Sequence, residues 1–151
     1  MPSSEILLVQ ADFLGAERLR LLLDRSGYRV AGVAGRTAEA IRLVEQHRPR
    51  LAIVDMMLEI DVDGIKTATA LARGFALKIL ITTGFPDFVT EAEGAVELAC
   101  AIVKKPYTDD ELLAAVARCL SDTSATRRTG GRKPGPGRAR RGGREPAPGR
   151  G

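Results

Sequence analysis

The chain has 151 residues, of which 44% are hydrophobic and 4% aromatic, so a single aliphatic core of ordinary size can form. No apolar run approaches the ~18–20 residues of a membrane-spanning helix, and no signal-peptide pattern opens the chain, so we expect a cytoplasmic protein without a membrane partner. The net charge of +4 is uneven: residues 127–151 hold nine basic residues and one acid, whereas residues 1–126 hold 14 basic and 18 acidic residues. The basic charge therefore lies in the tail, and the net charge of the whole chain says nothing about the surface of the domain.

The first predicted unit is a strand followed by a helix. Residues 6–9 form a continuous apolar run, which is typical of a strand buried on both faces. Asp12 can cap the helix that follows, and Gly27 is a suitable stop for it. Its apolar stripe is predicted to consist of Leu14, Leu19, Leu22 and Leu23.

The same alternation continues through the domain. The pattern predicts an edge strand at 28–33, a helix from Thr37 to Pro49 and a buried strand at 51–55. After a loop at 59–63, it predicts a helix from Ile65 to about Arg73, a strand at 78–82 and a weak helix at 87–99. The last elements are a strand at 101–103 and a final helix after a capping box at 108–111. The inward side chains of these helices are predicted to be Ala40, Ile41, Val44, Ala68, Leu71, Ala72, Leu112, Leu113, Val116 and Leu120. Five repeats of strand and helix predict a doubly wound α/β fold, a parallel sheet with helices on both faces.

The composition changes sharply after about residue 121. Residues 129–151 contain eight glycines and four prolines and no hydrophobic side chain larger than alanine, so we expect disorder there. The predicted organisation is an extension at 1–4, a domain at 5–121 and a disordered tail at 122–151. The tail is either an inert solubilising extension or an unspecific, salt-sensitive contact for nucleic acid or another acidic surface; it has no aromatic side chains for base stacking.

Motifs of enzymes and metal sites are not found. Cys100 and Cys119 have no metal-binding or CxxC spacing, so we expect two free, buried thiols in a reducing compartment. His47, the only histidine, lies at a predicted helix end, where a surface charge is the simplest interpretation. No glycine-rich phosphate loop follows the first strand, so we do not expect an enzyme. An unrelated α/β enzyme or nucleotide-binding protein stays as a third hypothesis.

Polar residues follow four of the predicted strands. Gln10, Ala11 and Asp12 follow the first, and Asp55, Thr83 and Lys105 follow three others. Because ligands of open parallel sheets bind outside the carboxyl ends of the strands, these residues could share one site. An acid, a hydroxyl and a cation suit capture of a phosphoryl group. The bland alternatives are a loop cap, a turn-capping hydroxyl and a solvated lysine.

At this point the chain resembles the receiver domain of two-component response regulators, from Glu5 to about Leu120. The matching pieces are residues 6–9, residues 51–58 with Asp63-Gly64, residues 81–84 and residues 103–107. The resemblance implies a flavodoxin-like five-stranded parallel sheet in the order 2-1-3-4-5. It also implies that Asp55 accepts a phosphoryl group from a histidine kinase, that Thr83 reports the phosphate, that Lys105 contacts its oxygens and that Pro106 follows a cis bond.

The same resemblance implies a Mg²⁺ site. In the family, two acids after the first strand hold the ion together with the phosphoacceptor and a main-chain carbonyl, here that of Met57. This chain has Gln10 and Ala11 at those positions, and Asp12 follows one place later as a helix cap or a metal ligand. We therefore expect weak Mg²⁺ binding through Asp55, Met57 and Asp12. Ile102 replaces the usual switch aromatic, so the readout through Thr83 should be altered.

These residues support two functional hypotheses. The first is a single-domain response regulator that takes a phosphoryl group from a histidine kinase or a phosphotransfer protein. It would signal by docking on a downstream protein through the 87–99 helix, the last strand and the last helix. The second is a pseudo-receiver that binds partners independently of phosphorylation, as the replaced acids suggest.

Overall fold

The computed structural model describes residues 5–56, 64–84 and 99–121. Its five strands all pair in parallel, in the order β2-β1-β3-β4-β5. The strands are β1 (Glu5–Val9), β2 (Arg29–Ala34), β3 (Leu51–Asp55), β4 (Lys78–Thr83) and β5 (Ala99–Lys104). The described helices are α1 (Phe13–Arg25), α2 (Thr37–His47), α3 (Gly64–Gly74) and α6 (Asp109–Ser121). The predicted flavodoxin-like order is confirmed.

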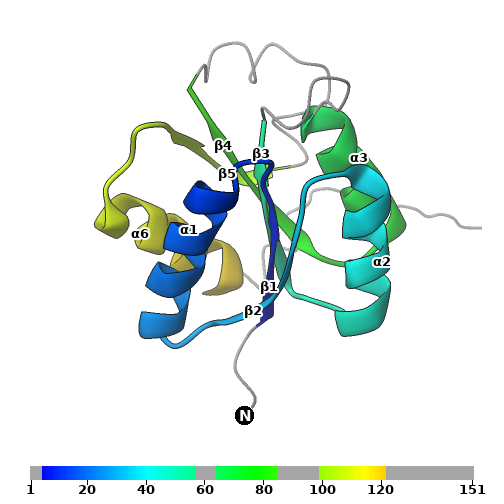
Figure 1. Ribbon diagram of the computed structural model, residues 1–151, viewed down its shortest axis with the longest axis horizontal. Helices are drawn as coiled ribbons and strands as arrows, with labels where there is room; N and C mark the ends of the chain where they lie inside the picture. The colour runs from blue at the N-terminus through cyan, green and yellow to red at the C-terminus, as the bar shows by residue number, and fades with distance from the viewer. Residues whose placement is uncertain (1–4, 57–63, 85–98, 122–151) are drawn as a thin grey trace, which may run out of the picture. The chain divides into compact units, whose positions relative to one another are not determined.

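The sheet separates two apolar clusters, one on each face. Helices α1 and α6 cover one face, and helices α2 and α3 cover the other (Figure 1). Alternate residues of the inner strands enter different clusters, so Ile6 and Leu8 face α1 and α6 whereas Leu7 and Val9 face α2 and α3. This two-sided burial explains why the central strands are continuously apolar. None of the helices in the described ranges is long and apolar enough to cross a membrane.

Helix α1 begins and ends as predicted but differs in its buried face. Asp12 accepts a hydrogen bond from the Leu14 amide at 3.2 Å, and Gly27 adopts a left-handed φ of 92° after the helix. Leu14, however, is 71% exposed, so its predicted place in the core stripe is wrong. The reason is that five residues along a helix rotate a side chain about 140° away from Leu19. Ala16 takes the buried position instead.

Helix α6 has both features that its sequence predicts. The capping box forms, with the Glu111 amide donating to Thr108 Oγ1 at 3.1 Å and the Thr108 amide donating to Glu111 Oε1 at 2.9 Å. Its buried side chains are Leu112, Ala115, Val116, Cys119 and Leu120, and Leu113 packs at the edge of the same cluster. The helix is therefore held on the sheet by an almost continuous apolar stripe.

The boundaries of the last strand differ from the prediction. Strand β5 begins at Ala99, so the predicted strand at 101–103 is too short and the predicted helix at 87–99 cannot include its last residue. The rest of that predicted helix falls mainly in 85–98, outside the described residues, as do the extension at 1–4, the loop at 59–63 and the tail at 122–151.

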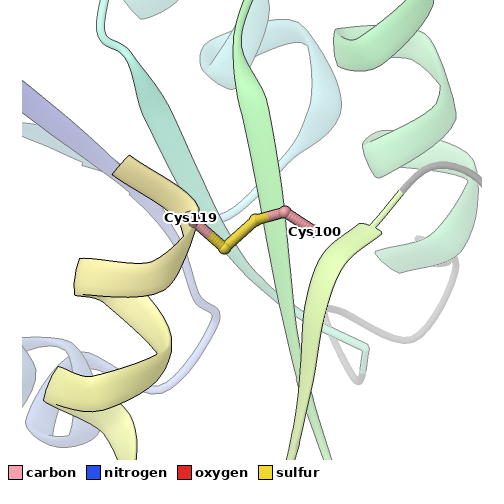
Figure 2. The surroundings of a disulfide bond; sticks show 2 residues. All are labelled: Cys100 and Cys119. Atoms are coloured by element: carbon pink, nitrogen blue, oxygen red, sulfur yellow. A yellow bond between two sulfur atoms is a disulfide. The ribbon is translucent and has the colours of Figure 1, made fainter. Parts of the chain in front are cut away.

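The two cysteines form a disulfide, which contradicts the predicted free thiols. Cys100 lies at the start of β5 and Cys119 near the end of α6, with 5.6 Å between their Cα atoms (Figure 2). A separation of 19 residues without a recognisable motif carries no signal for such a bond. Only the packing of α6 on the sheet brings the two residues together.

Candidate functional site

The predicted site residues lie at the carboxyl ends of the strands, which together form the upper edge of the sheet in Figure 1. Parallel pairing sets this alignment: Val9 lies beside Val54, Asp55 beside Thr82, and Thr83 beside Lys104. The residues that end β3 and β4 and those that follow β1 and β5 therefore lie at the same level of the sheet.

Asp55 and Lys105 form the centre of this edge. Lys105 Nζ lies 3.1 Å from Asp55 Oδ1 and 3.0 Å from Oδ2, and the two side chains are 37% and 11% exposed respectively. The backbone of this region is tied to β4, because the Lys105 amide donates to the Thr83 carbonyl at 2.7 Å. The Lys105–Pro106 peptide is cis, as the resemblance implied. The ammonium compensates a carboxylate that would be costly to bury alone.

Thr83 is fully buried and its hydroxyl points toward the residue after Asp55. Its Oγ1 donates to Met56 Sδ at 3.2 Å, and the Met56 amide donates to the Thr82 carbonyl at 3.0 Å. A thioether is a weak hydrogen-bond acceptor. Nothing in the sequence pattern singled out Met56, because an apolar side chain beside a strand end gives no chemical signal.

The residues after β1 do not present a pair of acids. Gln10 is 9% exposed and its Nε2 donates to the Ile53 carbonyl at 3.3 Å, so the amide is tied to the backbone of β3. Ala11 is exposed and contributes no ligand atom. The Asp12 carboxylate caps α1 through the Leu14 amide. Of the two predicted roles for Asp12, the structure shows that of a helix cap.

These residues do not fit a tight magnesium site. Mg²⁺ in proteins is held by one or two carboxylates within an octahedral shell. Across residues 5–56, 64–84 and 99–121, no group of three or more His, Cys, Asp or Glu side chains is arranged to hold a metal ion. Among the described residues, Asp55 is the acid at the centre of this edge. Met57, whose carbonyl the resemblance placed in the ion's shell, lies outside the described residues.

Gly64 supports the end of β3 at a distance that leaves no room for a side chain. Its amide donates to the Met56 carbonyl at 3.1 Å. A Cβ atom at this position would lie 2.3 Å from the Asp55 carbonyl oxygen and 2.6 Å from Met56 Cα. The backbone of the first residue of α3 therefore packs directly against the backbone that carries Asp55.

Tyr107 is a further neighbour of the acid, and it lies two residues after Lys105. Burial of the ring, together with the negative charge of Asp55, raises the pKa of the Tyr107 phenol above its ordinary value. The ring also lines a cavity of about 620 Å³ beside α1, together with Lys105, Arg18, Arg25 and Asp109. The sequence offered one signal for Tyr107, an aromatic residue directly after Lys105-Pro106.

Ile102 lies three residues before Lys105, where the resemblance implies an aromatic residue. Its side chain is partly buried against the cluster on the α2–α3 face. An aliphatic side chain in this position has no hydroxyl or ring edge to couple with Thr83. The predicted alteration of the readout stays a prediction.

The sheet order, with helices on both faces, defines a flavodoxin-like fold. The chain belongs to the response regulator receiver domain family, whose model matches residues 6–117. It is 30% identical over 118 residues to the transcriptional regulatory protein PdtaR of Mycobacterium tuberculosis, covering 77% of this chain and 56% of that protein. It is 27% identical over 128 residues to the phyllosphere-induced regulator PhyR of Methylorubrum extorquens, covering 83% and 47% respectively.

The comparison with solved structures supports the same fold. A CheY-like receiver domain protein from Methanospirillum hungatei superposes with a TM-score of 0.73 at 22% identity, covering 82% of this chain and 98% of that one. The chain spans about half the length of the curated relatives it matches. Receiver domains are signalling modules, and the chain is a response regulator receiver domain of a two-component system.

Proposed function

We propose that Asp55 is the phosphoacceptor of this receiver domain and that Lys105 and Thr83 assist the transfer. The observation that carries the proposal is the contact of Lys105 Nζ with both oxygens of Asp55, at 3.1 and 3.0 Å. A carboxylate with a cation beside it meets the main requirement of phosphoryl transfer, which is positioning and neutralisation of charge.

The transfer uses groups that are already in place. One Asp55 carboxylate oxygen forms the bond to phosphorus, while the bond from phosphorus to the donor's leaving atom breaks and its electron pair stays with the donor. Lys105 then moves from the carboxylate to the phosphoryl oxygens. Thr83 exchanges the Met56 sulfur, a weak acceptor, for a phosphoryl oxygen, a strong one.

The first test is direct labelling with a small phosphodonor. The full chain, incubated with acetyl phosphate over a range of Mg²⁺ concentrations, is expected to gain the mass of one phosphoryl group. Peptide mapping after borohydride trapping should place it on Asp55. Absence of any mass gain at every metal concentration would leave the pseudo-receiver, which acts independently of phosphorylation, as the remaining function.

We also propose that Mg²⁺ binds this edge only weakly. When bound to a receiver domain, the ion neutralises charge on the phosphoryl group. Among the residues that the structure describes, Asp55 is the carboxylate available to the Mg²⁺ ion. The Asp12 carboxylate caps α1, and the Gln10 side chain donates to the backbone of β3.

The variant Ala11→Asp tests this explanation of weak metal binding. A second carboxylate should raise Mg²⁺ affinity by at least about tenfold, because a unit charge near an ion at the protein surface contributes more than about 1.4 kcal/mol. The affinity can be followed by the intrinsic fluorescence of Tyr107 or by calorimetry. Ala11→Asn, which adds a similar side chain without charge, is the matched control. Equal affinities of the two variants would contradict the explanation.

The proposed partners follow from this chemistry and from the surface. A histidine kinase or phosphotransfer protein would donate the phosphoryl group, and a downstream protein would read its presence, in the cytoplasm where such relays operate. Helix α1 exposes the apolar side chains of Phe13, Leu14 and Leu21, which are available for contact with a partner protein.

The domain at residues 5–121 would signal by docking on another protein. For the basic tail at 122–151 the two hypotheses are still an inert extension and an unspecific contact for an acidic surface.

A further inference from the structure

The disulfide between Cys100 and Cys119 depends on an irregularity in the edge strand. In the pairing of β4 with β5, Ile79 lies beside Ala99 and Leu80 beside Ala101, so Cys100 is an extra residue without a partner. Such a bulge redirects side chains. Cys100 and Ala101, although adjacent, both contact the cluster under α1 and α6, whereas Ala99 and Ile102 face the other cluster. In a regular strand continued back from Ala101, Cys100 would lie beside Ile79 and face the α2–α3 cluster.

The bond joins two segments that the core already holds together. Helix α6 buries Leu112, Val116 and Leu120 at 0 to 9% exposure, and these contacts do not involve the two sulfur atoms. Its last turn has a second attachment, since Arg50 Nη2 donates to the Leu120 carbonyl at 3.1 Å. We therefore expect the reduced chain to stay folded with α6 on the sheet.

The two sulfur-bearing residues differ in access. Cys119 is 1% exposed, within the apolar cluster, whereas Cys100 is partly exposed on the edge strand (Figure 2). Cys100 is therefore the more accessible of the two residues to a thiol reagent from solution. Access to one sulfur is sufficient for thiol–disulfide exchange.

From this placement we propose that Cys100 and Cys119 form a reversible redox-modification site, with small thiols and disulfides of the glutathione class as reactants. In oxidation, the Cys100 thiolate attacks the small disulfide, forms a mixed disulfide and releases one small thiol. The Cys119 thiolate then displaces the second small thiol, so two protein thiols become one disulfide and one small disulfide becomes two thiols. Reduction reverses both steps, beginning at Cys100. The redox state sets how firmly the last turn of α6 is held on β5.

The experiment follows the full-length chain through glutathione buffers of different reduced-to-oxidised ratio, without denaturant. After each redox step the thiols are alkylated with a maleimide in denaturant, and mass mapping should show two labelled cysteines after reduction and none after reoxidation, over repeated cycles. Hydrogen exchange in residues 116–121 should be faster in the reduced chain. The midpoint of thermal unfolding should fall by about 10 °C on reduction, as expected for a crosslink of this loop length.

Single-cysteine variants test the order of attack. In Cys119→Ser, Cys100 should take up one glutathione from oxidised glutathione. In Cys100→Ser, Cys119 should react at least about tenfold more slowly because it is buried. The chain with both substitutions should match the reduced protein in hydrogen exchange, and its exchange should not change with the glutathione ratio of the buffer. These results do not involve Asp55, so an Asp55→Asn chain should behave identically, whatever the outcome of phosphoryl labelling.

Three results would overturn the proposal. Reduction that requires unfolding of the chain would make the bond a permanent crosslink. Equal reactivity of the two single-cysteine variants would remove Cys100 as the point of attack. Identical hydrogen exchange of α6 in both redox states would show that the bond restrains nothing.

Discussion

Replacement of Asp55 by asparagine should abolish phosphoryl incorporation while leaving the domain folded. The amide has no anionic oxygen to attack phosphorus. The fold should persist because the lost partner of Asp55, the Lys105 ammonium, is 37% exposed and can be hydrated. We expect the free energy of unfolding to change by less than about 1 kcal/mol, as for other partly exposed ion pairs. Mass spectrometry after acetyl phosphate treatment and urea unfolding followed by circular dichroism measure the two effects.

Asp12→Asn is the matched control for this prediction. Asparagine caps helices about as well as aspartate, so α1 should be unaffected. Because the Asp12 carboxylate accepts the Leu14 amide, its charge should have little influence on labelling of Asp55. Equal loss of labelling in both variants would show that Asp12 is part of the acceptor site, and retained labelling in Asp55→Asn would remove Asp55 as the acceptor.

Replacement of Gly64 by alanine should destabilise the domain by about 3 kcal/mol, a large effect for one methyl group. The added Cβ would lie 2.3 Å from the Asp55 carbonyl oxygen and 2.7 Å from that of Met56. Both neighbours are backbone atoms, so no side-chain rotation can relieve the clash. Helix α3 must move away from the end of β3, and the Asp55 carboxylate moves with that strand end. Urea unfolding and the rate of phosphoryl incorporation should both report this change.

Gly74→Ala is the control at the other end of the same helix. A Cβ atom at Gly74 meets nothing within 4 Å. Alanine is the better helix former, so this variant should gain up to about 1 kcal/mol of stability and keep its labelling rate. Similar losses for the two variants would mean that the close approach at Gly64 is not the cause.

The elements of the fold could be predicted from local patterns because each strand and helix has its own periodicity. The continuous apolar runs at 6–9 and 51–54 indicated strands buried on both faces, and the capping box at 108–111 located the start of α6. Leu14 was wrongly predicted to be buried because it is apolar, although its position in the first turn rotates its side chain away from the buried face of α1. The full length of β5 could not be predicted because the residues before 101 do not form a strand-like run.

The residues of the candidate site were visible in the sequence because polar side chains at strand ends stand out against apolar runs. Their contacts were not, since the pairing of Lys105 with Asp55 spans 50 residues and depends on the register of three strands. The sequence by itself determined the alternation of elements, the identity of the acid, hydroxyl and cation, and the missing pair of acids after β1. The tertiary structure alone decided that Lys105 pairs with Asp55, that Gly64 packs on the backbone of Asp55, and that a bulge places Cys100 beside Cys119. Each of these follows from contacts between segments, which local composition does not encode.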